Sequence, residues 1–403
     1  MKSISKLFTL IILLIAVSCT TKNEFTLEND SVARILNISN DGQLFTSEVF
    51  NKIAGQRLIP KDKEEFRLRI SQGTHIEGSD LVLTSEDFKF VKVLKEDSNS
   101  LGFLLKNKEH LLEVEVHYEV GKDDFYIHKY LNIKSTTPVT IERIDVESLS
   151  LVDIYQPYQI KQITSQGVAE WRPGLGQPLY GSESATFFGM EFPAADNYVE
   201  NKKGYCGYLW GKEIKANEIY TSHKAVIGVG DNPEFIQETF FSYIDRIRIR
   251  PLRLQVQYNS WFDFYSGVDK EKFNQSVSKV HQELVNKRGV DPLKAYVIDD
   301  GWQDVSADWS DKAWKVNSKF DADFSTSFKN VELAGSKLGL WLSPGCLFGA
   351  QPAARNYREQ GFETMGKWMS MAGPKYMQLL EDRMLELTNK GVNYFKLDGI
   401  FGH

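Results

Sequence analysis

The chain has 403 residues, of which 42% are hydrophobic and 25% are charged, a composition that is ordinary for soluble globular proteins. A chain of this length predicts two or three domains. The formal net charge is -6 and no run of lysines and arginines occurs, which argues against a nucleic-acid-binding protein. The same charge balance is compatible with a neutral substrate.

The N-terminus, MKSISKLFTLIILLIAVSC, has the pattern of an export signal, because two lysines precede an apolar stretch from Leu7 to Val17. This stretch is too short to span a bilayer comfortably. Its end, AVSC, resembles a bacterial lipobox, in which Cys19 is lipidated and becomes the new N-terminus; secretory cleavage near Ala16 is the alternative. We expect a signal peptide over residues 1–18 and a lipidated tether over 19–24. The protein would then be an exported bacterial lipoprotein in the outer membrane or periplasm.

Residues 25–250 have the pattern of strands separated by turns. In LLEVEVHYEV, which ends at Val120, every second residue is apolar, as in a strand with one buried and one solvent-facing side. Turn residues follow, and then a second strand, FYIHKYLNI. Helical periodicity is nearly absent over this region. The sequence therefore predicts an antiparallel β-sandwich domain over residues 25–250.

From residue 251 onward, strands alternate with helices. Helices are predicted after Asp269, around residues 328–337 and from Pro374, and the strands are RLQVQYNSWF, LKAYVIDDGW, LGLWLSPG and NYFKLDG. The apolar strand runs favour a parallel sheet that is covered on both faces. Four such units are half of a (β/α)8 barrel. An open doubly wound sheet is the competing arrangement, but no glycine-rich phosphate fingerprint follows any of the strands.

These two regions together predict a multi-domain β plus α/β protein. Residues 251–403 would form the first half of a (β/α)8 TIM barrel, truncated after the fourth strand. We expect the chain to be the N-terminal portion of a longer enzyme, because a closed barrel needs eight parallel strands.

Polar and aromatic side chains stand at the carboxyl end of each of the four predicted strands. Because barrel active sites form at the carboxyl ends of the strands, these side chains would face one pocket. Side chains alternate along a strand, so Lys396 and Asp398 share one face. The candidate site residues are Trp261, Asp299, Asp300, Trp302, Trp341, Lys396 and Asp398.

Each candidate also has a purely structural interpretation. The two aspartates of DDG can hold a turn at Gly301, and a tryptophan is most often a core residue. Lys396 and Asp398 can form a structural ion pair, although the burial of charges is costly unless they are well paired. Three tryptophans beside carboxylates favour a pocket that stacks a sugar ring while the carboxylates accept its hydroxyls.

No HExxH, GxSxG, P-loop or EF-hand pattern occurs, so metal, acyl-transfer and phosphoryl-transfer chemistry lack the residues that they need. Cys206 and Cys346 have no metal-ligand spacing, and we interpret both as buried apolar residues. We therefore expect no metal and no cofactor. Glycosidic cleavage needs only carboxylates, and those are present.

Four segments resemble the melibiase group of glycoside hydrolases, the α-galactosidase clan, and within it family 36. They are YNSW, VIDDGWQ, LGLW and YFKLDG, and they occur in that order after the predicted sandwich. GLGQPLY and FFGMEFPA in the sandwich are similar too, so the resemblance covers nearly all of the mature chain. It implies a retaining hydrolase of oligosaccharides or polysaccharides with terminal α-galactosyl residues.

The resemblance also implies a role for most candidates. The aspartate of KxD, Asp398, would be the nucleophile. Lys396 and the two aspartates of DDGW would contact sugar hydroxyls, and Trp302 and Trp341 would shape the sugar pocket. Since a nearby cation favours the ionised carboxylate, we expect Lys396 to keep Asp398 charged.

Retaining cleavage needs a second carboxyl about 5–5.5 Å from the nucleophile. The resemblance places this acid/base aspartate on a later strand, beyond residue 403. WLSPGCLFG after the third strand and GIF after the nucleophile depart from the family pattern. These departures leave the specificity open between α-galactosides, α-N-acetylgalactosaminides and the transfer reaction of raffinose-synthase relatives. The alternative outside the enzymes is a catalytically incomplete carbohydrate-binding lipoprotein. The oligomeric state stays open.

Overall fold

The computed structural model describes residues 22–71, 80–157, 160–163, 169–172, 174–306, 309 and 312–400. The predicted signal peptide and Cys19 lie outside the described residues. The chain divides into two compact units, the first of which ends at Pro251 while the second begins at Leu252. We call them the sheet unit and the α/β unit, and each is described by itself.

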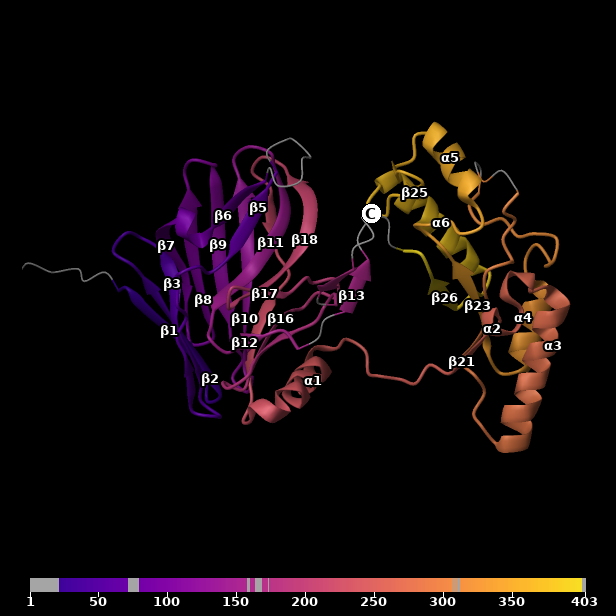
Figure 1. Cartoon of the computed structure of the whole chain (residues 1–403), viewed down its shortest axis with the longest axis horizontal. Coiled ribbons are helices and arrows are strands. Elements are labelled where there is room, and N and C mark those ends of the chain that lie inside the picture. The colour runs from indigo at the N-terminus through magenta and orange to yellow at the C-terminus, as the bar shows by residue number, and fades with distance from the viewer. Residues whose placement is uncertain are drawn as a thin grey trace, which may run out of the picture. The chain divides into compact units, whose positions relative to one another are not determined.

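Antiparallel strands build the sheet unit, so the predicted β-rich architecture is confirmed (Figure 1, indigo to magenta). One sheet has the order β1-β2-β3-β4, a second β17-β18-β11-β5-β6, and a third β12-β15-β16-β20-β10-β9-β8-β7 with β19 on β10; β13 and β14 form a separate pair. The strands are β1 (Glu24–Glu28), β2 (Val32–Ile38), β3 (Leu44–Asn51), β4 (Gln56–Leu58), β5 (Arg67–Ile70), β6 (Leu81–Thr84), β7 (Lys89–Glu96), β8 (Ser100–Asn107), β9 (Leu112–Glu119), β10 (Tyr126–Ser135), β11 (Val139–Ser150), β12 (Ile154–Tyr155), β13 (Ile160–Ile163), β14 (Ala169–Arg172), β15 (Leu179–Gly181), β16 (Thr186–Met190), β17 (Tyr198–Glu200), β18 (Lys203–Ile214), β19 (Ile219–Thr221) and β20 (Ala225–Val229).

The alternation predicted for LLEVEVHYEV is present in β9. Val114 and Val116 are buried, whereas Glu113 and Glu115, which alternate with them along the strand, are partly exposed. Buried faces from all three larger sheets share one hydrophobic core. The sheets therefore pack against each other through their apolar faces, as strands with one apolar and one polar face require.

The sheet unit also contains a helix that the sequence analysis does not predict, α1 (Ile236–Ile247), with short 3-10 turns at η1 (Ser85–Asp87) and η2 (Pro233–Phe235). Ile236 and Tyr243 of α1 pack against Tyr126 and Phe187 of the long sheet. Ile236, Phe240 and Tyr243 recur at helical spacing, which is the signal that could have revealed α1.

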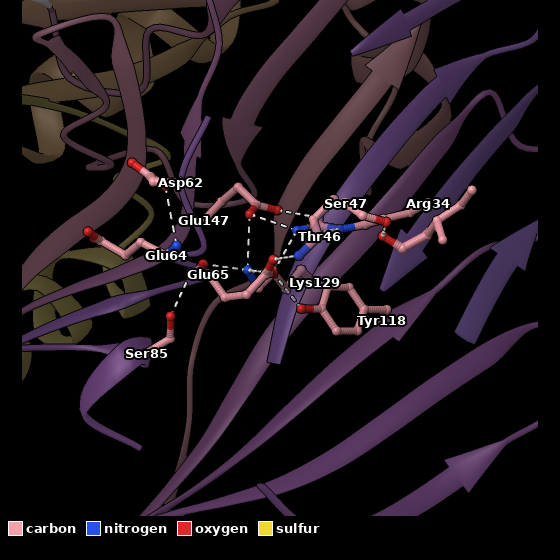
Figure 2. A network of polar contacts seen from close by, with 11 residues as sticks. Arg34, Thr46, Ser47, Asp62, Glu64, Glu65, Ser85, Tyr118, Lys129 and Glu147 are labelled. Atoms are coloured by element: carbon pink, nitrogen blue, oxygen red, sulfur yellow. Dashed lines mark hydrogen bonds and ion pairs between the residues drawn. The ribbon is translucent and has the colours of Figure 1, made fainter. Parts of the chain in front are cut away.

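A network of fully buried charges crosses the core of the sheet unit (Figure 2). Arg34 contacts Glu147 at 2.6 Å and Glu65 at 2.8 Å, and Lys129 contacts the same two carboxylates at 3.0 Å and 2.9 Å. The Tyr118 hydroxyl donates to Glu65 at 2.6 Å. Two cations thus balance two anions, which is the condition under which buried ions are tolerated.

The electrostatics of Glu65 follow from this pairing. Burial by itself raises the pKa of a carboxyl, but Lys129, Arg34 and the hydrogen bonds from Thr46 and Tyr118 together lower the pKa of Glu65 to about 2. Because this folded-state pKa lies below the ordinary value of 4.5, the stability that Glu65 contributes is present above pH 4.5 and is lost as the pH falls toward 2.

The α/β unit contains a four-stranded parallel sheet in the order β21-β22-β23-β26, so the predicted parallel sheet is confirmed (Figure 1). Its strands are β21 (Gln257–Asn259), β22 (Ala295–Ile298), β23 (Lys337–Leu342) and β26 (Tyr394–Leu397), and a small hairpin pairs β24 (Thr364–Met365) with β25 (Trp368–Met369). The structure establishes four neighbouring parallel strands. The truncated barrel stays a prediction.

The helices of this unit lie between the strands in sequence. They are α2 (Trp261–Phe264), η3 (Tyr265–Gly267), α3 (Lys270–Val280), its π-helical continuation η4 (His281–Asn286), α4 (Ser325–Leu333), α5 (Gln351–Glu359) and α6 (Pro374–Asn389). Asp269 caps α3 by accepting a hydrogen bond from the Lys272 amide at 2.8 Å, as its position predicts. Within the described part of the chain, no helix combines the length and the apolar character that a membrane span requires.

Candidate active site

The strand register brings the predicted site residues to one edge of the parallel sheet. Asn259 pairs with Val297, Ile298 with Leu340 and Leu342 with Leu397. The residues that directly follow the four strands therefore lie at the carboxyl edge of one sheet. This is the edge at which α/β proteins place their ligands.

Asp299 is the centre of the hydrogen bonding at this edge and is 1% exposed. Its Oδ2 accepts from Lys396 Nζ and from Asn259 Nδ2, both at 2.7 Å, and its Oδ1 accepts from the Asp300 amide at 2.9 Å. Its own amide donates to Ser260 Oγ at 3.0 Å. The carboxylate is thereby fixed, and its charge is balanced by the lysine.

The structure gives Lys396 a different ion-pair partner from the one that the sequence suggests. Lys396 pairs with Asp299 at 2.7 Å, and the described residues show no ion pair between Lys396 and Asp398. The influence of Lys396 on the charge of Asp398 stays a prediction. Residues two apart are separated by roughly 6.5 Å along an extended chain. The lysine side chain instead reaches across the sheet to the end of β22.

Asp398 directly follows β26 and is partly exposed. Its amide continues the ladder by donating to the Leu342 carbonyl at 2.9 Å. Its Oδ2 accepts from Trp341 Nε1 at 3.2 Å and its Oδ1 accepts from the Gly399 amide at 2.8 Å. Two N–H donors thus set the orientation of a carboxylate that solvent can reach.

The loop after β23 clamps the residue that follows Asp398. The amides of Gly345 and Cys346 both donate to the Gly399 carbonyl, at 3.0 Å and 2.9 Å. Gly399 has a φ of +54°, and a Cβ there would lie 2.8 Å from Cys346 Cβ and 2.9 Å from Ser343 Oγ. Glycine is therefore required at this position, because both the backbone angle and the space exclude a side chain.

The three tryptophans have different surroundings. Trp341 is 2% exposed and holds Asp398. Trp302 is completely buried and donates from Nε1 to the Trp341 carbonyl at 2.9 Å, so it belongs to the core beneath Trp341 and not to a pocket wall as expected. Trp261 is half-buried in α2, and its ring packs edge-on against Tyr265 with a centroid distance of 5.2 Å.

Asp300 accepts its side-chain hydrogen bond from the neutral amide of Gln303 and not from a cation. Burial raises its pKa above the ordinary value, and the charges of Asp299 and Asp398 raise it further. A hydrogen bond from Gln303 Nε2 to Asp300 Oδ1 opposes this shift, since it favours the ionised form. Gln303 is itself fixed, because its Oε1 accepts from the Gly301 amide at 3.0 Å.

We expect Gln303→Leu to raise the pKa of Asp300 further, because the substitution removes the donor that stabilises the carboxylate. A 13C NMR titration of the Asp300 carboxyl in the ligand-free protein measures this shift. Gln378→Leu, on the exposed surface of α6, is the matched control and leaves the Asp300 titration unchanged. A pKa that stays in place or falls in Gln303→Leu contradicts the assignment.

Sequence reasoning does not single out Asn259, Ser260 and Gln303 as functional residues. All three are polar and stand inside the segments YNSW and VIDDGWQ that carry the resemblance. Asn259 and Ser260 lie near the carboxyl end of the predicted strand RLQVQYNSWF, and Gln303 directly follows LKAYVIDDGW. These positions are the signal that could have found them.

Comparison with solved structures gives α-galactosidases as neighbours. The galactosidase domain of the α-galactosidase-sucrose kinase AgaSK is 14% identical, with a TM-score of 0.64, over 94% of this chain and 67% of that chain. The GH36 α-galactosidase AgaB from Geobacillus stearothermophilus is 13% identical, with a TM-score of 0.64, over 93% of this chain and 64% of that chain. A variant of AgaA from the same organism, solved with raffinose, is 13% identical, with a TM-score of 0.63, over 93% and 65%. Another AgaA variant was solved with stachyose.

These neighbours identify the fold as that of GH36 α-galactosidases, in agreement with the resemblance drawn from the sequence motifs. The chain spans about two thirds of the length of these structures. No protein-family model matches the chain, and a search of curated proteins finds no match in sequence.

Proposed function

We propose that this protein is a glycoside hydrolase that cleaves terminal α-galactosides by retaining double displacement, with Asp398 as the nucleophile. The observation that carries the proposal is the Asp398 carboxylate at the end of β26, held by Trp341 and Gly399 at the sheet edge where Asp299 binds Lys396. A nucleophilic carboxylate must be oriented and accessible, and Asp398 meets both conditions. The α-galactosidase fold of the chain supports the same substrate class.

The other site residues bind the sugar in this proposal. Lys396 and Asp299 present an ammonium donor and a carboxylate acceptor side by side, which suits neighbouring sugar hydroxyls. Asp300 accepts a further hydroxyl. The half-buried Trp261 borders the ring, while Trp341 orients Asp398 and Trp302 donates to the Trp341 carbonyl.

In this proposal, the α/β unit is the first half of a (β/α)8 barrel over residues 251–403, and residues 25–250, which precede it in the sequence, form a β-sandwich domain. The acid/base carboxyl is then supplied by a part of the enzyme outside these 403 residues. The share of the α-galactosidase structures that the chain covers, 64–67%, supports this assignment. Oligosaccharides such as raffinose and stachyose are the proposed substrates, by analogy with the AgaA complexes.

An aryl α-galactoside with a strongly acidic phenol tests the proposal on the chain itself. Such a leaving group departs with little help from a general acid, whereas hydrolysis of the galactosyl-enzyme needs a general base. We expect a burst of one phenol per chain followed by slow turnover. Galactose binding without any phenol release would instead favour a catalytically incomplete carbohydrate-binding lipoprotein.

Export as a lipoprotein is part of the proposed function, since it would place the enzyme where it meets extracellular glycans. The AVSC sequence at Ala16 to Cys19 supports it. We expect Cys19→Ala to abolish incorporation of radiolabelled palmitate and to move the protein from the membrane fraction to the soluble fraction. Cys206→Ala is the control and retains the label, and a labelled Cys19→Ala protein would contradict the anchor.

A further inference from the structure

The loop from Ser343 to Phe348, which we call the clamp loop, follows β23 and holds the residue next to Asp398. The amides of Gly345 and Cys346 both donate to the Gly399 carbonyl, at 3.0 Å and 2.9 Å. The Gly399 amide in turn donates to Asp398 Oδ1 at 2.8 Å. Gly399 is thus held by the clamp loop through its carbonyl, and it orients Asp398 through its amide.

The clamp loop has a backbone shape that depends on its surroundings. Leu347 has a φ of +47°, which residues with a side chain rarely adopt. The Leu347 side chain is 1% exposed and belongs to the core of the α/β unit. The amides of Leu347 and Phe348 donate to the carbonyl and the hydroxyl of Ser343, at 3.0 Å and 3.2 Å. Because a strained backbone of this kind persists only where its contacts over-determine it, the anchors of the loop set its shape.

Tyr376 of α6 is an anchor of the clamp loop. It is completely buried, and its hydroxyl donates to the carbonyl of Pro344, the residue before Gly345. Burial raises the pKa of Tyr376 well above the ordinary value of 10, so the hydroxyl keeps the proton that it donates. Met369 of β25 holds the same turn, since its amide donates to the Gly345 carbonyl at 2.9 Å. The clamp loop is therefore fixed from α6 and from β25.

The position of Tyr376 is itself determined by neighbouring groups. Glu363 Oε2 accepts from the Tyr376 amide at 3.0 Å, and Glu363 Oε1 accepts from the Lys375 amide at 3.2 Å. Both amides belong to the first turn of α6, where a helix leaves its N–H groups without partners in the helix. The Tyr376 ring also packs beside the Tyr357 ring, with a centroid distance of 6.3 Å. The hydroxyl is thus directed at Pro344 by a fixed backbone and a packed ring.

We propose that Tyr376 is a positioning residue for Asp398. Its hydroxyl holds Pro344, the amides of the next two residues hold the Gly399 carbonyl, and the Gly399 amide orients the Asp398 carboxylate. A nucleophile reacts efficiently only when it is held in line with the atom that it attacks, so the rate of attack depends on this chain of contacts. The inference rests on the proposed function and adds to it a residue that acts through the clamp loop.

Tyr376→Phe tests the inference, because it removes the hydroxyl and keeps the ring. Tyr357→Phe is the matched control: Tyr357 is also completely buried, and its hydroxyl also donates to a backbone carbonyl, that of Trp309 at 3.0 Å. Stopped-flow absorbance with an activated aryl α-galactoside gives the rate of the burst, and titration calorimetry gives the dissociation constant of galactose. Hydrogen exchange followed by mass spectrometry reports on the amides of the clamp loop.

In Tyr376→Phe the burst should be about tenfold slower while galactose binds within about twofold of the wild type, since misplacement of the nucleophile slows attack and leaves sugar binding in place. The amides of the clamp loop should also exchange faster in this variant. Tyr357→Phe should keep the wild-type burst rate and the wild-type exchange of the clamp loop. A merely structural role of Tyr376 would not separate the burst rate from galactose binding.

Three results would overturn the positioning role and leave the proposed function standing. They are equal burst rates in the two variants, wild-type exchange of the clamp loop in Tyr376→Phe, and a loss of galactose binding in Tyr376→Phe that matches the loss of rate. A wild-type chain that shows no burst overturns the proposed function and the positioning role together.

Discussion

Replacement of Asp398 by alanine should lower the rate of phenol release from an activated aryl α-galactoside by about 10⁴-fold or more, because the covalent intermediate then has no nucleophile on which to form. The burst disappears as well, whereas galactose still binds through Asp299 and Lys396. Stopped-flow absorbance of the released phenol measures both the rate and the burst.

Asp382→Asn is the control for Asp398→Ala, since Asp382 is an exposed carboxyl on α6. It should keep the full burst. A burst of normal size in Asp398→Ala would assign the nucleophile to another residue. Loss of galactose binding in the same variant would mean that Asp398 holds the site together, and the kinetic loss could then not be ascribed to nucleophilic attack.

Replacement of Arg34 by methionine should lower the free energy of unfolding of the sheet unit by about 3–5 kcal/mol. The substitution leaves Glu65 and Glu147 with Lys129 as their one remaining cation in the network, so one buried negative charge is uncompensated. Hydrogen exchange of the amides in β2, β9 and β10 under increasing urea reports on this unit separately.

Arg57→Met provides the matched comparison for Arg34→Met. Arg57 is largely exposed, pairs with Glu48 and has its guanidinium carbon 4.1 Å from the Phe50 ring centroid. Its replacement should lower the free energy of unfolding by about 1 kcal/mol or less. The double variant Arg34→Met/Glu147→Gln restores neutrality and should recover part of the loss. Equal effects of Arg34→Met and Arg57→Met would show that the buried charges contribute no more than a surface pair.

Much of the fold was predictable because local signals agree with it. Asp269 stands where a helix N-cap belongs, and its side chain caps α3. Pro374 occupies the first turn of α6, and Gly391 follows that helix with a φ of +111°. Such signals depend on a few neighbouring residues, which the sequence displays directly.

The buried network of the sheet unit was predictable in part. Lys129 occurs in phase with Ile127 and Leu131, and Arg34 in phase with Val32 and Leu36, so alternation alone places both cations on buried faces. Their partners could not be predicted, because Glu65 and Glu147 come from distant parts of the chain. Pairing of that kind depends on how the sheets pack.

The contacts in the candidate active site were also predictable only in part. The sequence places Lys396 and Asp398 on one strand face, but the choice of Asp299 as the partner of Lys396 depends on how β22, β23 and β26 align. The burial of Trp302 depends on the packing of Phe324, whose ring centroid lies 5.5 Å away. Contacts between strands are settled by tertiary structure, and a one-dimensional pattern does not contain them.

The most direct test of the account is to locate the covalent bond. The protein would be treated with a fluorinated α-galactosyl donor whose glycosyl-enzyme hydrolyses slowly, then digested and sequenced by tandem mass spectrometry. The account predicts a fluorogalactosyl group on the side chain of Asp398. A label on Asp299 or Asp300, or steady turnover of the donor without any labelled peptide, would contradict it.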